Sequence, residues 1–234
     1  MADEKVRYEL RDDVALITLD DGKANALGHD VMDLLGACLK RAEGEARAVL
    51  LVGRDRRLSG GFDLNVMASG FDAARALVTA GAELVLRLYT FPRPTVVACT
   101  GHALAAGAML LLAADWRVGA RGDFKIGLNE VAIRLTLPLF ALELARDRLS
   151  KRHFTAAVTQ ARIFDPETAK DAGFLDATET PAALLATAFQ RARELGALPD
   201  PAFRDTKARE RAATVELIRA TLAADLITLM PKQS

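Results

Sequence analysis

The sequence has 234 residues, of which 51% are hydrophobic and 26% charged, so its composition is typical of a folded globular protein and excludes a disordered one. Lys and Arg number 31, as do Asp and Glu, and a net charge of zero gives no electrostatic reason to expect a nucleic-acid partner. The charged segment 1–10 is unlike a signal peptide, and the longest apolar run, 103–114, is too short to span a bilayer. We therefore expect a cytoplasmic protein that binds neither nucleic acid nor membrane.

Strand-like and helix-like segments alternate through the first two thirds of the chain. Short apolar or alternating runs predict the strands, and apolar residues at helical spacing predict the helices. Strands are expected within 6–22, where a turn joins two of them, and at 46–53, 91–101 and 116–127; helices are expected at 28–45, 71–90 and 102–115. This alternation favours parallel strands with right-handed crossovers, and so an α/β fold.

The last third of the chain is strongly helical. Residues 129–138 are expected to be extended and 175–180 to form a short strand, with helices at 139–149, 150–160, 164–174, 181–198 and 205–230. Asp165, Pro166 and Gly173 supply the cap, the first residue and the end of one of these helices. This region carries more apolar surface than a solvated tail needs, so it is expected to pack on the core or on a neighbouring subunit.

The two cysteines carry no sign of a metal site. Cys38 and Cys99 lie in apolar segments, and neither has another Cys or a His at metal-ligand spacing. We expect two buried thiols of the kind found in a reducing compartment, and no bound metal.

Two strand-to-helix connections share one design. In LLVGRDRRLSGGFDL (50–64) and VVACTGHALAAGAML (96–110), a loop of small residues joins an apolar strand to the start of a helix. Small residues there leave the first N–H groups of the helix uncovered, and the helix dipole favours negative charge at that end. Two such loops facing each other would form an oxyanion hole, in which one donor contributes about 3–4 kcal/mol. Ordinary packing of helices on a sheet selects the same small residues, so only the pair is informative.

Four motifs in this order resemble those of the crotonase superfamily, the enoyl-CoA hydratase/isomerase family. They are GKANAL (22–27), LSGGFDL (58–64), TGHALAAGAML (100–110) with Asp115 beyond it, and KIGLNEVAI (125–133). The resemblance implies a spiral of ββα units in residues 1–185 and a C-terminal helical region, 186–234, used to form a homotrimer or hexamer. It also implies an acyl-CoA substrate, with coenzyme A as part of that substrate and no separate cofactor.

The resemblance assigns roles to individual residues. The two N–H donors that hold an enolate formed at the thioester oxygen fall on Phe62 and Ala106. The residues that match the loop around the adenine end of CoA are Ala24, Asn25, Ala26 and Leu27. Further residues assigned to substrate binding are Gly61, Asp63, Leu64, Met109 and Arg134, with Asp63 also the expected cap of the helix that follows it. The segment 207–213 is interpreted as a solvated helix face, with Lys207 or an arginine of this segment as an alternative ligand for a CoA phosphate.

One acid-base residue of the family is replaced in this chain. Hydratases of the family use two glutamates, and the matching positions hold Met109 and Glu130. Adding water needs one group to activate the water and another to handle the α-proton, and methionine can do neither. Moving a double bond from C3 to C2 needs a single base, which takes a proton from C2 and returns one to C4. We therefore predict a Δ3,Δ2-enoyl-CoA isomerase with Glu130 as the proton shuttle.

The residues leave several alternatives open. The chain can be a hydratase, or a relative acting on a dicarboxylic acyl-CoA, in which another group replaces the missing acid. It can also be an acyl-CoA-binding protein without catalysis, or a structural protein of this fold. Arg134 stands where relatives often have glycine, and it can pair with Glu130, bind a carboxylate on the acyl group, or lie in solvent or an interface. Glu130 itself can be a carboxylate that caps a turn.

Overall fold

The strands of the computed structural model, which describes residues 5–228, form two sheets. The larger sheet has the strand order β1-β2-β3-β5-β7-β9, and the smaller has the order β4-β6-β8. β1 and β2 are antiparallel, and the other neighbouring strands are parallel, as the alternation of strands and helices predicts. The strands are β1 Val6–Arg11, β2 Val14–Leu19, β3 Ala48–Val52, β4 Arg56–Ser59, β5 Thr95–Cys99, β6 Gly101–Leu104, β7 Trp116–Ala120, β8 Ile126–Gly127 and β9 Ala177–Glu179.

Several helices begin and end at residues that favour those positions. The Asp165 carboxylate accepts hydrogen bonds from two N–H groups of the first turn of α7, Pro166 is the first residue of that helix, and Gly173 ends it with a φ of +99°. These three predictions are confirmed. The helices are α1 His29–Glu45, α2 Leu64–Ala68, α3 Phe71–Tyr89, α4 Ala106–Ala113, α5 Leu139–Arg148, α6 Lys151–Val158, α7 Pro166–Ala172, α8 Pro181–Gly196 and α9 Ala202–Thr228, with a 3₁₀ turn at Val131–Ile133.

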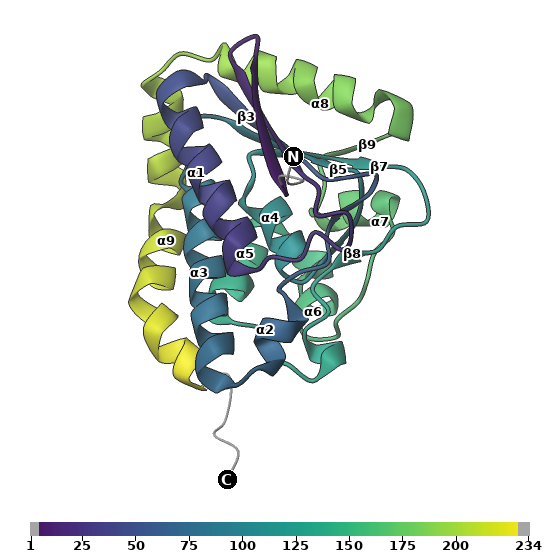
Figure 1. Ribbon diagram of the computed structural model, residues 1–234, viewed down its shortest axis with the longest axis vertical. Coiled ribbons are helices and arrows are strands. Elements are labelled where there is room, and N and C mark those ends of the chain that lie inside the picture. The colour runs from purple at the N-terminus through teal and green to yellow at the C-terminus, as the bar shows by residue number, and fades with distance from the viewer. Residues whose placement is uncertain (1–4, 229–234) are drawn as a thin grey trace.

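The larger sheet separates two apolar cores. Along β3, Val49 and Leu51 pack into the core that includes α1, α3 and α4, whereas Leu50 and Val52 pack into the core that α8 closes on the other face. Figure 1 shows α8 lying across the sheet on the side away from α1 and α3. The predicted boundary between the spiral, 1–185, and the C-terminal helical region, 186–234, falls within α8. The buried residues of α8 pack in the apolar core on one face of the larger sheet.

The smaller sheet is formed by strands that continue from the larger one. β3 leads to β4 and then α2, β5 leads to β6 and then α4, and β7 leads to β8 and then the 3₁₀ turn. At its start β6 lies very close to β4: a Cβ at Gly101 would lie 1.9 Å from the carbonyl oxygen of Arg56, so only glycine fits there. The chain therefore repeats a unit of two strands and a helical segment, as expected.

The structure corrects three predicted features. The helix expected over 102–115 begins only at Ala106, because residues 101–104 form β6 between β4 and β8. The segment expected to be extended contains the 3₁₀ turn, since the carbonyl of Glu130 accepts the N–H groups of Ile133 and Leu135. Cys99 is buried as expected, whereas Cys38 is only partly buried.

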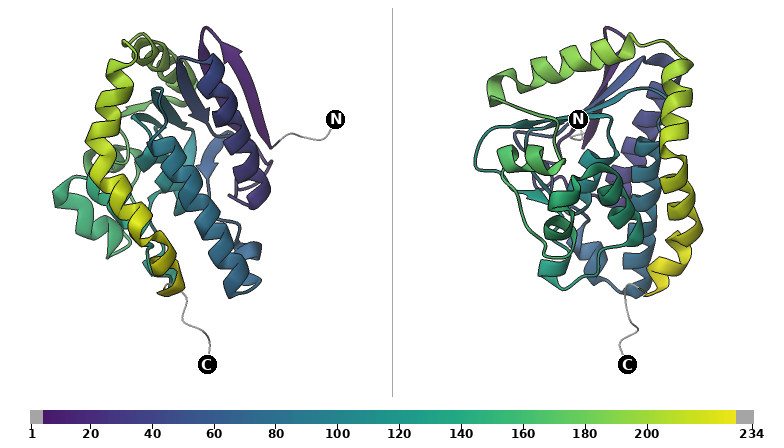
Figure 2. Two further views of the ribbon diagram at one scale, coloured as in Figure 1. Left: turned by 90° about the vertical axis from the view of Figure 1, so that its left-hand side faces the viewer. Right: turned by 180° about the vertical axis from the view of Figure 1, so that it is seen from behind.

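Helix α9 runs along the length of the molecule beside α3 (Figures 1 and 2). It packs on α5 and α3 of its own chain and buries Val215, Ile218 and Leu226. The last third of the chain was expected to pack on the core or on a neighbouring subunit, and α9 packs on the core of its own chain. Within residues 5–228, no helix is both long enough and apolar enough to cross a membrane.

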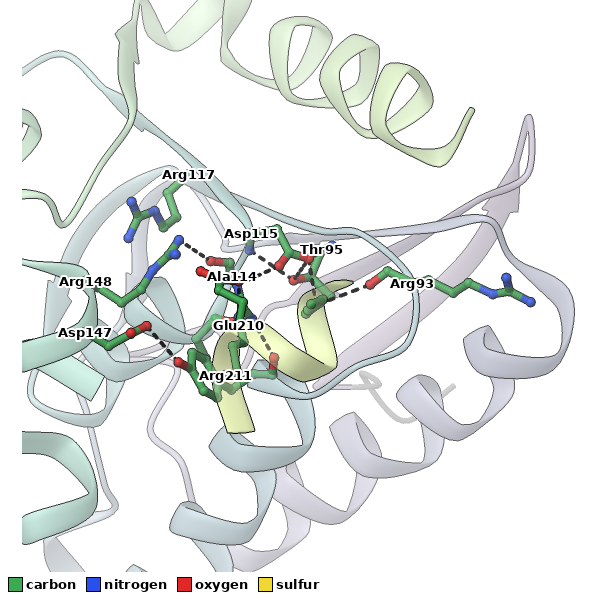
Figure 3. A network of polar contacts seen from close by, with 12 residues as sticks. Arg93, Thr95, Ala114, Asp115, Arg117, Asp147, Arg148, Glu210 and Arg211 are labelled. Carbon is green, nitrogen blue, oxygen red and sulfur yellow. Dashed lines mark hydrogen bonds and ion pairs between the residues drawn. The ribbon is translucent and has the colours of Figure 1, made fainter. Parts of the chain in front are cut away.

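A buried group of charged side chains holds the first half of α9 on the core (Figure 3). The carboxylate of Asp115, which follows α4, accepts hydrogen bonds from Lys207 Nζ at 2.7 Å and Arg211 Nη2 at 2.8 Å. Thr95 donates its N–H and its hydroxyl to the same carboxylate at 2.7 and 3.0 Å. Lys207 is 6% exposed and Arg211 3% exposed, so this face of α9 is not solvated, and Lys207 is already engaged by Asp115 and not free for a phosphate.

Candidate active site

A cavity of about 190 Å³ opens between the two small-residue loops and the segment that follows β8. Its walls are mainly apolar. The residues that line it are Gly60, Phe62, Leu64, Met67, Val78, Ala105, Met109, Asn129, Glu130, Ile133, Leu135, Thr136 and Pro138. The structure thus brings together Phe62, Leu64, Met109 and Glu130 from the set of residues predicted to form the site.

The two small-residue loops are in direct contact beside this cavity. Gly61 has a φ of +101°, and a Cβ there would lie 3.0 Å from the Cβ of Ala105 and 3.5 Å from the backbone nitrogen of Ala106. A Cβ at Gly107 would lie 2.4 Å from the carbonyl oxygen of Ser59. Because any side chain at Gly61 or Gly107 would force the loops apart, glycine is what allows their close approach.

The N–H of Phe62 points away from Leu27, the residue with which Phe62 forms a β-bridge. Leu27 forms a parallel bridge with Phe62, in which the Leu27 N–H donates to the Gly61 carbonyl at 2.8 Å and the Leu27 carbonyl accepts the Asp63 N–H at 3.3 Å. Phe62 lies between the Gly61 carbonyl and the Asp63 N–H, and in a parallel bridge the residue at that position turns its own N–H and C=O away from the partner strand. Within residues 5–228 the Phe62 N–H donates to no backbone acceptor, so it is left for another group.

A second N–H is left at the start of α4. Ala106 is the first residue of this helix, and the first N–H groups of a helix have no partner within it. Ala105 before it has a φ of +49° and a ψ of −123°, a conformation that residues other than glycine rarely adopt. The Ala105 N–H donates to the Gly127 carbonyl at 3.0 Å, which helps to hold this strained residue in place. Strain of this kind is typical of functional sites.

Helix α3 fixes the side chain of Phe62. A Cβ at Gly81 of α3 would lie 2.2 Å from Cε1 of the Phe62 ring, so the ring fills the space that the missing side chain leaves. The contact also restrains the backbone of Phe62 and therefore the direction of its N–H. Gly81 is a site residue that sequence reasoning missed, because a glycine within a helical pattern carries no sign of its distant partner.

Glu130 is the only ionisable residue among the described residues that line the cavity. It is 6% exposed, and its Oε2 has no hydrogen-bond partner within residues 5–228. Burial raises the pKa of Glu130 to about 7, and a hydrogen bond from its own backbone N–H opposes this only in part. The carboxylate does not cap the 3₁₀ turn that begins beside it. A buried, incompletely paired carboxylate facing a cavity is suited to accept and release a proton near neutral pH.

Two neighbours of Glu130 complete the inner part of the cavity. Met109 of α4 is buried and lines the cavity, and it offers only a thioether. Asn129 also lines the cavity, and its Oδ1 is buried without a hydrogen-bond partner among the described residues. Asn129 was missed by sequence reasoning, since an asparagine before a turn has a common structural explanation. Within residues 5–228, no cluster of His, Cys, Asp and Glu side chains could hold a metal ion.

The loop predicted to hold the adenine end of CoA supports the first small-residue loop. The side-chain nitrogen of Asn25 donates to the carbonyls of Leu19 and Leu58 at 2.9 and 3.0 Å, and the Ala24 carbonyl accepts the Gly60 N–H at 2.8 Å. The side chains of Asn25 and Leu27 are buried, so they are not available to a ligand. Ala24 and Ala26 are partly exposed, and contact with a ligand from this loop would have to come mainly from them.

Three other predicted residues lie at the edge of the cavity or outside it. Asp63 caps α2, as predicted, by accepting the Asn65 N–H at 2.8 Å, and it does not line the cavity. Leu64 is 71% exposed at the rim. Arg134 is exposed and forms no ion pair with Glu130. Its φ of +65° and ψ of +28° explain why glycine suits this position, because only glycine adopts that conformation freely.

Comparisons with known proteins place the chain in one family. A sequence profile described as enoyl-CoA hydratase/isomerase matches residues 9–229. A probable enoyl-CoA hydratase of Rhodobacter capsulatus is 38% identical over 123 residues, which make up 52% of this chain and 48% of that protein. The chain therefore spans about half the length of this curated relative.

Solved structures match over nearly the whole chain. An enoyl-CoA hydratase/isomerase family protein from Pseudomonas syringae superposes with a TM-score of 0.94 at 42% identity and covers 97% of this chain and 98% of its own. An enoyl-CoA isomerase of Mycobacterium tuberculosis superposes with a TM-score of 0.91 at 40% identity and covers 96% of this chain and 100% of its own. The fold is thus the crotonase fold with its C-terminal helix, as predicted. The chain belongs to the enoyl-CoA hydratase/isomerase family.

Proposed function

We propose that the protein is a Δ3,Δ2-enoyl-CoA isomerase that uses Glu130 as its single acid-base group. The observation that carries this proposal is the composition of the cavity wall, in which Glu130 is the only ionisable residue of the described lining and α4 contributes Met109. A hydratase needs groups for two proton transfers, whereas in an isomerase a single base takes a proton from one carbon of the substrate and gives one back at another.

The proposed reaction moves one proton and one double bond. Glu130 removes a proton from C2 of a 3-enoyl-CoA, the electron pair of that C–H bond forms a C1–C2 double bond, and the C=O pair of the thioester moves onto oxygen to give a dienolate. When C4 later takes up a proton with the C3–C4 electron pair, the C1–C2 pair becomes the new C2–C3 double bond. The thioester oxygen carries the negative charge and accepts hydrogen bonds from the N–H groups of Phe62 and Ala106. The protonated Glu130 then gives a proton to C4, the dienolate collapses to the 2-enoyl-CoA, and the carboxylate is restored.

The surroundings of Glu130 support this role. A pKa of about 7 means that the carboxylate is available as a base at neutral pH and that its conjugate acid can release the proton again. The apolar wall keeps water away from the dienolate and strengthens the N–H contacts to the thioester oxygen. We expect coenzyme A to be part of the substrate, with the backbone at Ala24 and Ala26 beside its adenine end, and no separate cofactor.

The proposal is tested by incubating the protein with a 3-enoyl-CoA in heavy water and following products by mass spectrometry, with Glu130→Gln alongside. We expect conversion to the 2-enoyl-CoA, and a loss of about 10²- to 10⁴-fold in kcat for Glu130→Gln with acyl-CoA binding retained. Glu216→Gln, an exposed glutamate of α9, serves as the matched control and should keep full activity. A product heavier by one water would contradict the isomerase and favour a hydratase. Binding without any conversion would favour a non-catalytic acyl-CoA-binding protein.

Assembly and location are further proposals that rest on the family. We infer that the chain forms a homotrimer or hexamer in the cytoplasm. Light scattering of the purified protein measures the mass of the assembly directly, and a monomer would contradict the inference.

A further inference from the structure

The start of α5 is capped by a residue from the far end of the chain. Pro138 occupies the N-cap position of α5 and has no side-chain acceptor, so the first N–H of the helix needs a partner from elsewhere. That partner is Asp225 of α9, whose Oδ2 accepts the Leu139 N–H at 2.7 Å. A carboxylate at this end of a helix is also favoured by the helix dipole.

The capped segment is a wall of the cavity. Leu135, Thr136 and Pro138 line the cavity together with residues of the small-residue loops. The near end of this segment is tied to Glu130, whose carbonyl accepts the Leu135 N–H at 2.9 Å. Its far end is tied to Asp225 through Leu139. The position of the wall therefore depends on both attachments.

The element that carries Asp225 is fixed independently of this hydrogen bond. The first half of α9 is held by the ion pairs of Lys207 and Arg211 with Asp115, and the second half buries Ile218 and Leu226 in the core. Asp225 thus acts from a helix that the core already positions.

We propose that Asp225 is a positioning residue that sets the length of acyl chain the cavity accepts, by holding the 135–138 wall through the Leu139 N–H. Asp225 does not line the cavity, so it acts on the substrate only through that wall. This inference rests on acyl-CoA binding from the proposed function, but not on the isomerase reaction.

Three variants test the hydrogen bond itself by amide hydrogen exchange. Asp225→Ala removes the acceptor, Asp225→Asn keeps an acceptor oxygen, and Glu216→Ala changes an exposed residue of the same helix. We expect faster exchange in Asp225→Ala confined to peptides within 131–142, with Asp225→Asn and Glu216→Ala close to the parent protein. Unchanged exchange at 131–142 in Asp225→Ala, or faster exchange throughout α9, overturns the inference.

Binding of saturated acyl-CoAs by calorimetry tests the effect on specificity without any turnover. In Asp225→Ala, we expect the affinity for decanoyl-CoA to fall by about three- to thirtyfold relative to that for butanoyl-CoA, the range expected from loss of a helix cap. Asp225→Asn should restore the ratio of the parent protein. An equal loss for both ligands indicates a general structural role and contradicts the proposal. If the parent protein binds acyl-CoA but converts no 3-enoyl-CoA, the isomerase proposal fails while this ratio still decides the role of Asp225.

Discussion

The molecule encloses two carboxylates in opposite ways, one of them largely buried and the other fully buried. Asp115 lies in a polar cluster where Thr95, Lys207 and Arg211 donate four hydrogen bonds to its two oxygens. Glu130 lies in an apolar cavity, and its Oε2 has no partner within residues 5–228. A buried charge that is fully paired holds elements together. A buried charge that is incompletely paired lowers the stability of the fold, so a functional role is the explanation to seek. The contrast separates a structural carboxylate from the one that we propose to be catalytic.

The largest expected effect comes from removing the paired carboxylate. Asp115→Ala leaves Lys207 and Arg211 buried without their partner, so the free energy of unfolding should fall by about 3–5 kcal/mol in urea denaturation. Asp30→Ala, which breaks an exposed pair with Lys5, is the control and should cost less than about 1 kcal/mol. Equal costs for the two variants would remove the distinction between a buried cluster and a surface pair.

Removing the charge of Glu130, the incompletely paired carboxylate, should raise the stability of the protein and not lower it. The pKa of Glu130 is raised from 4.5 to about 7, so the folded chain holds this proton more tightly than the unfolded chain does, and stability falls as pH rises through that interval. Glu130→Gln removes the ionisation and should stabilise the protein at pH 8 by an amount on the order of 3 kcal/mol. The gain should shrink toward pH 5. Thermal unfolding at several pH values measures it, and a gain independent of pH would contradict the burial of a charge.

A third effect concerns the Phe62 N–H, the first of the two proposed donors. Gly81→Ala places a Cβ against the Phe62 ring, which must move and shift the Phe62 N–H, so kcat should fall by about ten- to a hundredfold. Gly44→Ala is the control, because a Cβ there meets nothing within 4 Å and the change should stabilise α1 by about 1 kcal/mol. Steady-state kinetics with a 3-enoyl-CoA measure kcat for both variants. An unchanged kcat in Gly81→Ala would show that the position of the Phe62 ring does not determine the direction of the Phe62 N–H.

The pH dependence of the reaction gives a smaller effect. As a base, Glu130 must be deprotonated in the free enzyme, so kcat/KM should rise with pH through about 7 and then level off. Below that point it should change by about tenfold per pH unit. A profile that is flat between pH 5 and 8 would exclude Glu130 as the base.

Arg134 should have the smallest effect. Its left-handed backbone is better suited to glycine, while glycine also has more freedom in the unfolded chain, so Arg134→Gly should change stability by less than about 1 kcal/mol. It lines no part of the cavity, and kcat/KM for a 3-enoyl-CoA should stay close to the parent value. A large drop in kcat/KM would place Arg134 back in the site.

Local signals made much of the fold predictable. Buried strands such as β3 and capped helices such as α7 carry their pattern within a few residues. β6 does not, because His102 and its small neighbours also suit a helix, and pairing with β4 and β8 decides the outcome. β4 begins with two arginines and lacks the apolar pattern of a buried strand.

The candidate site divides in the same way. Motifs carried by contiguous residues pointed to Phe62, Met109 and Glu130, which all line the cavity. The roles of Gly81 and Asp225 depend on partners far along the chain, and no pattern near them reveals those partners. The interpretation of 207–213 as a solvated face holds for the five exposed residues of this segment but was wrong for Lys207 and Arg211, whose charges are paired with an aspartate in another element.

The contact between Gly107 and the Ser59 carbonyl has an evolutionary consequence. No side chain lies between the two loops at this point, so contact between their backbones sets the distance between them. Substitutions in the surrounding apolar residues should therefore leave the relative position of the two N–H groups unchanged. Met67 and Val78 line the same cavity from α2 and α3 and can change without touching that contact. Under the proposed function, ordinary substitutions can therefore fit the cavity to new acyl groups while the distance between the two proposed N–H donors stays the same.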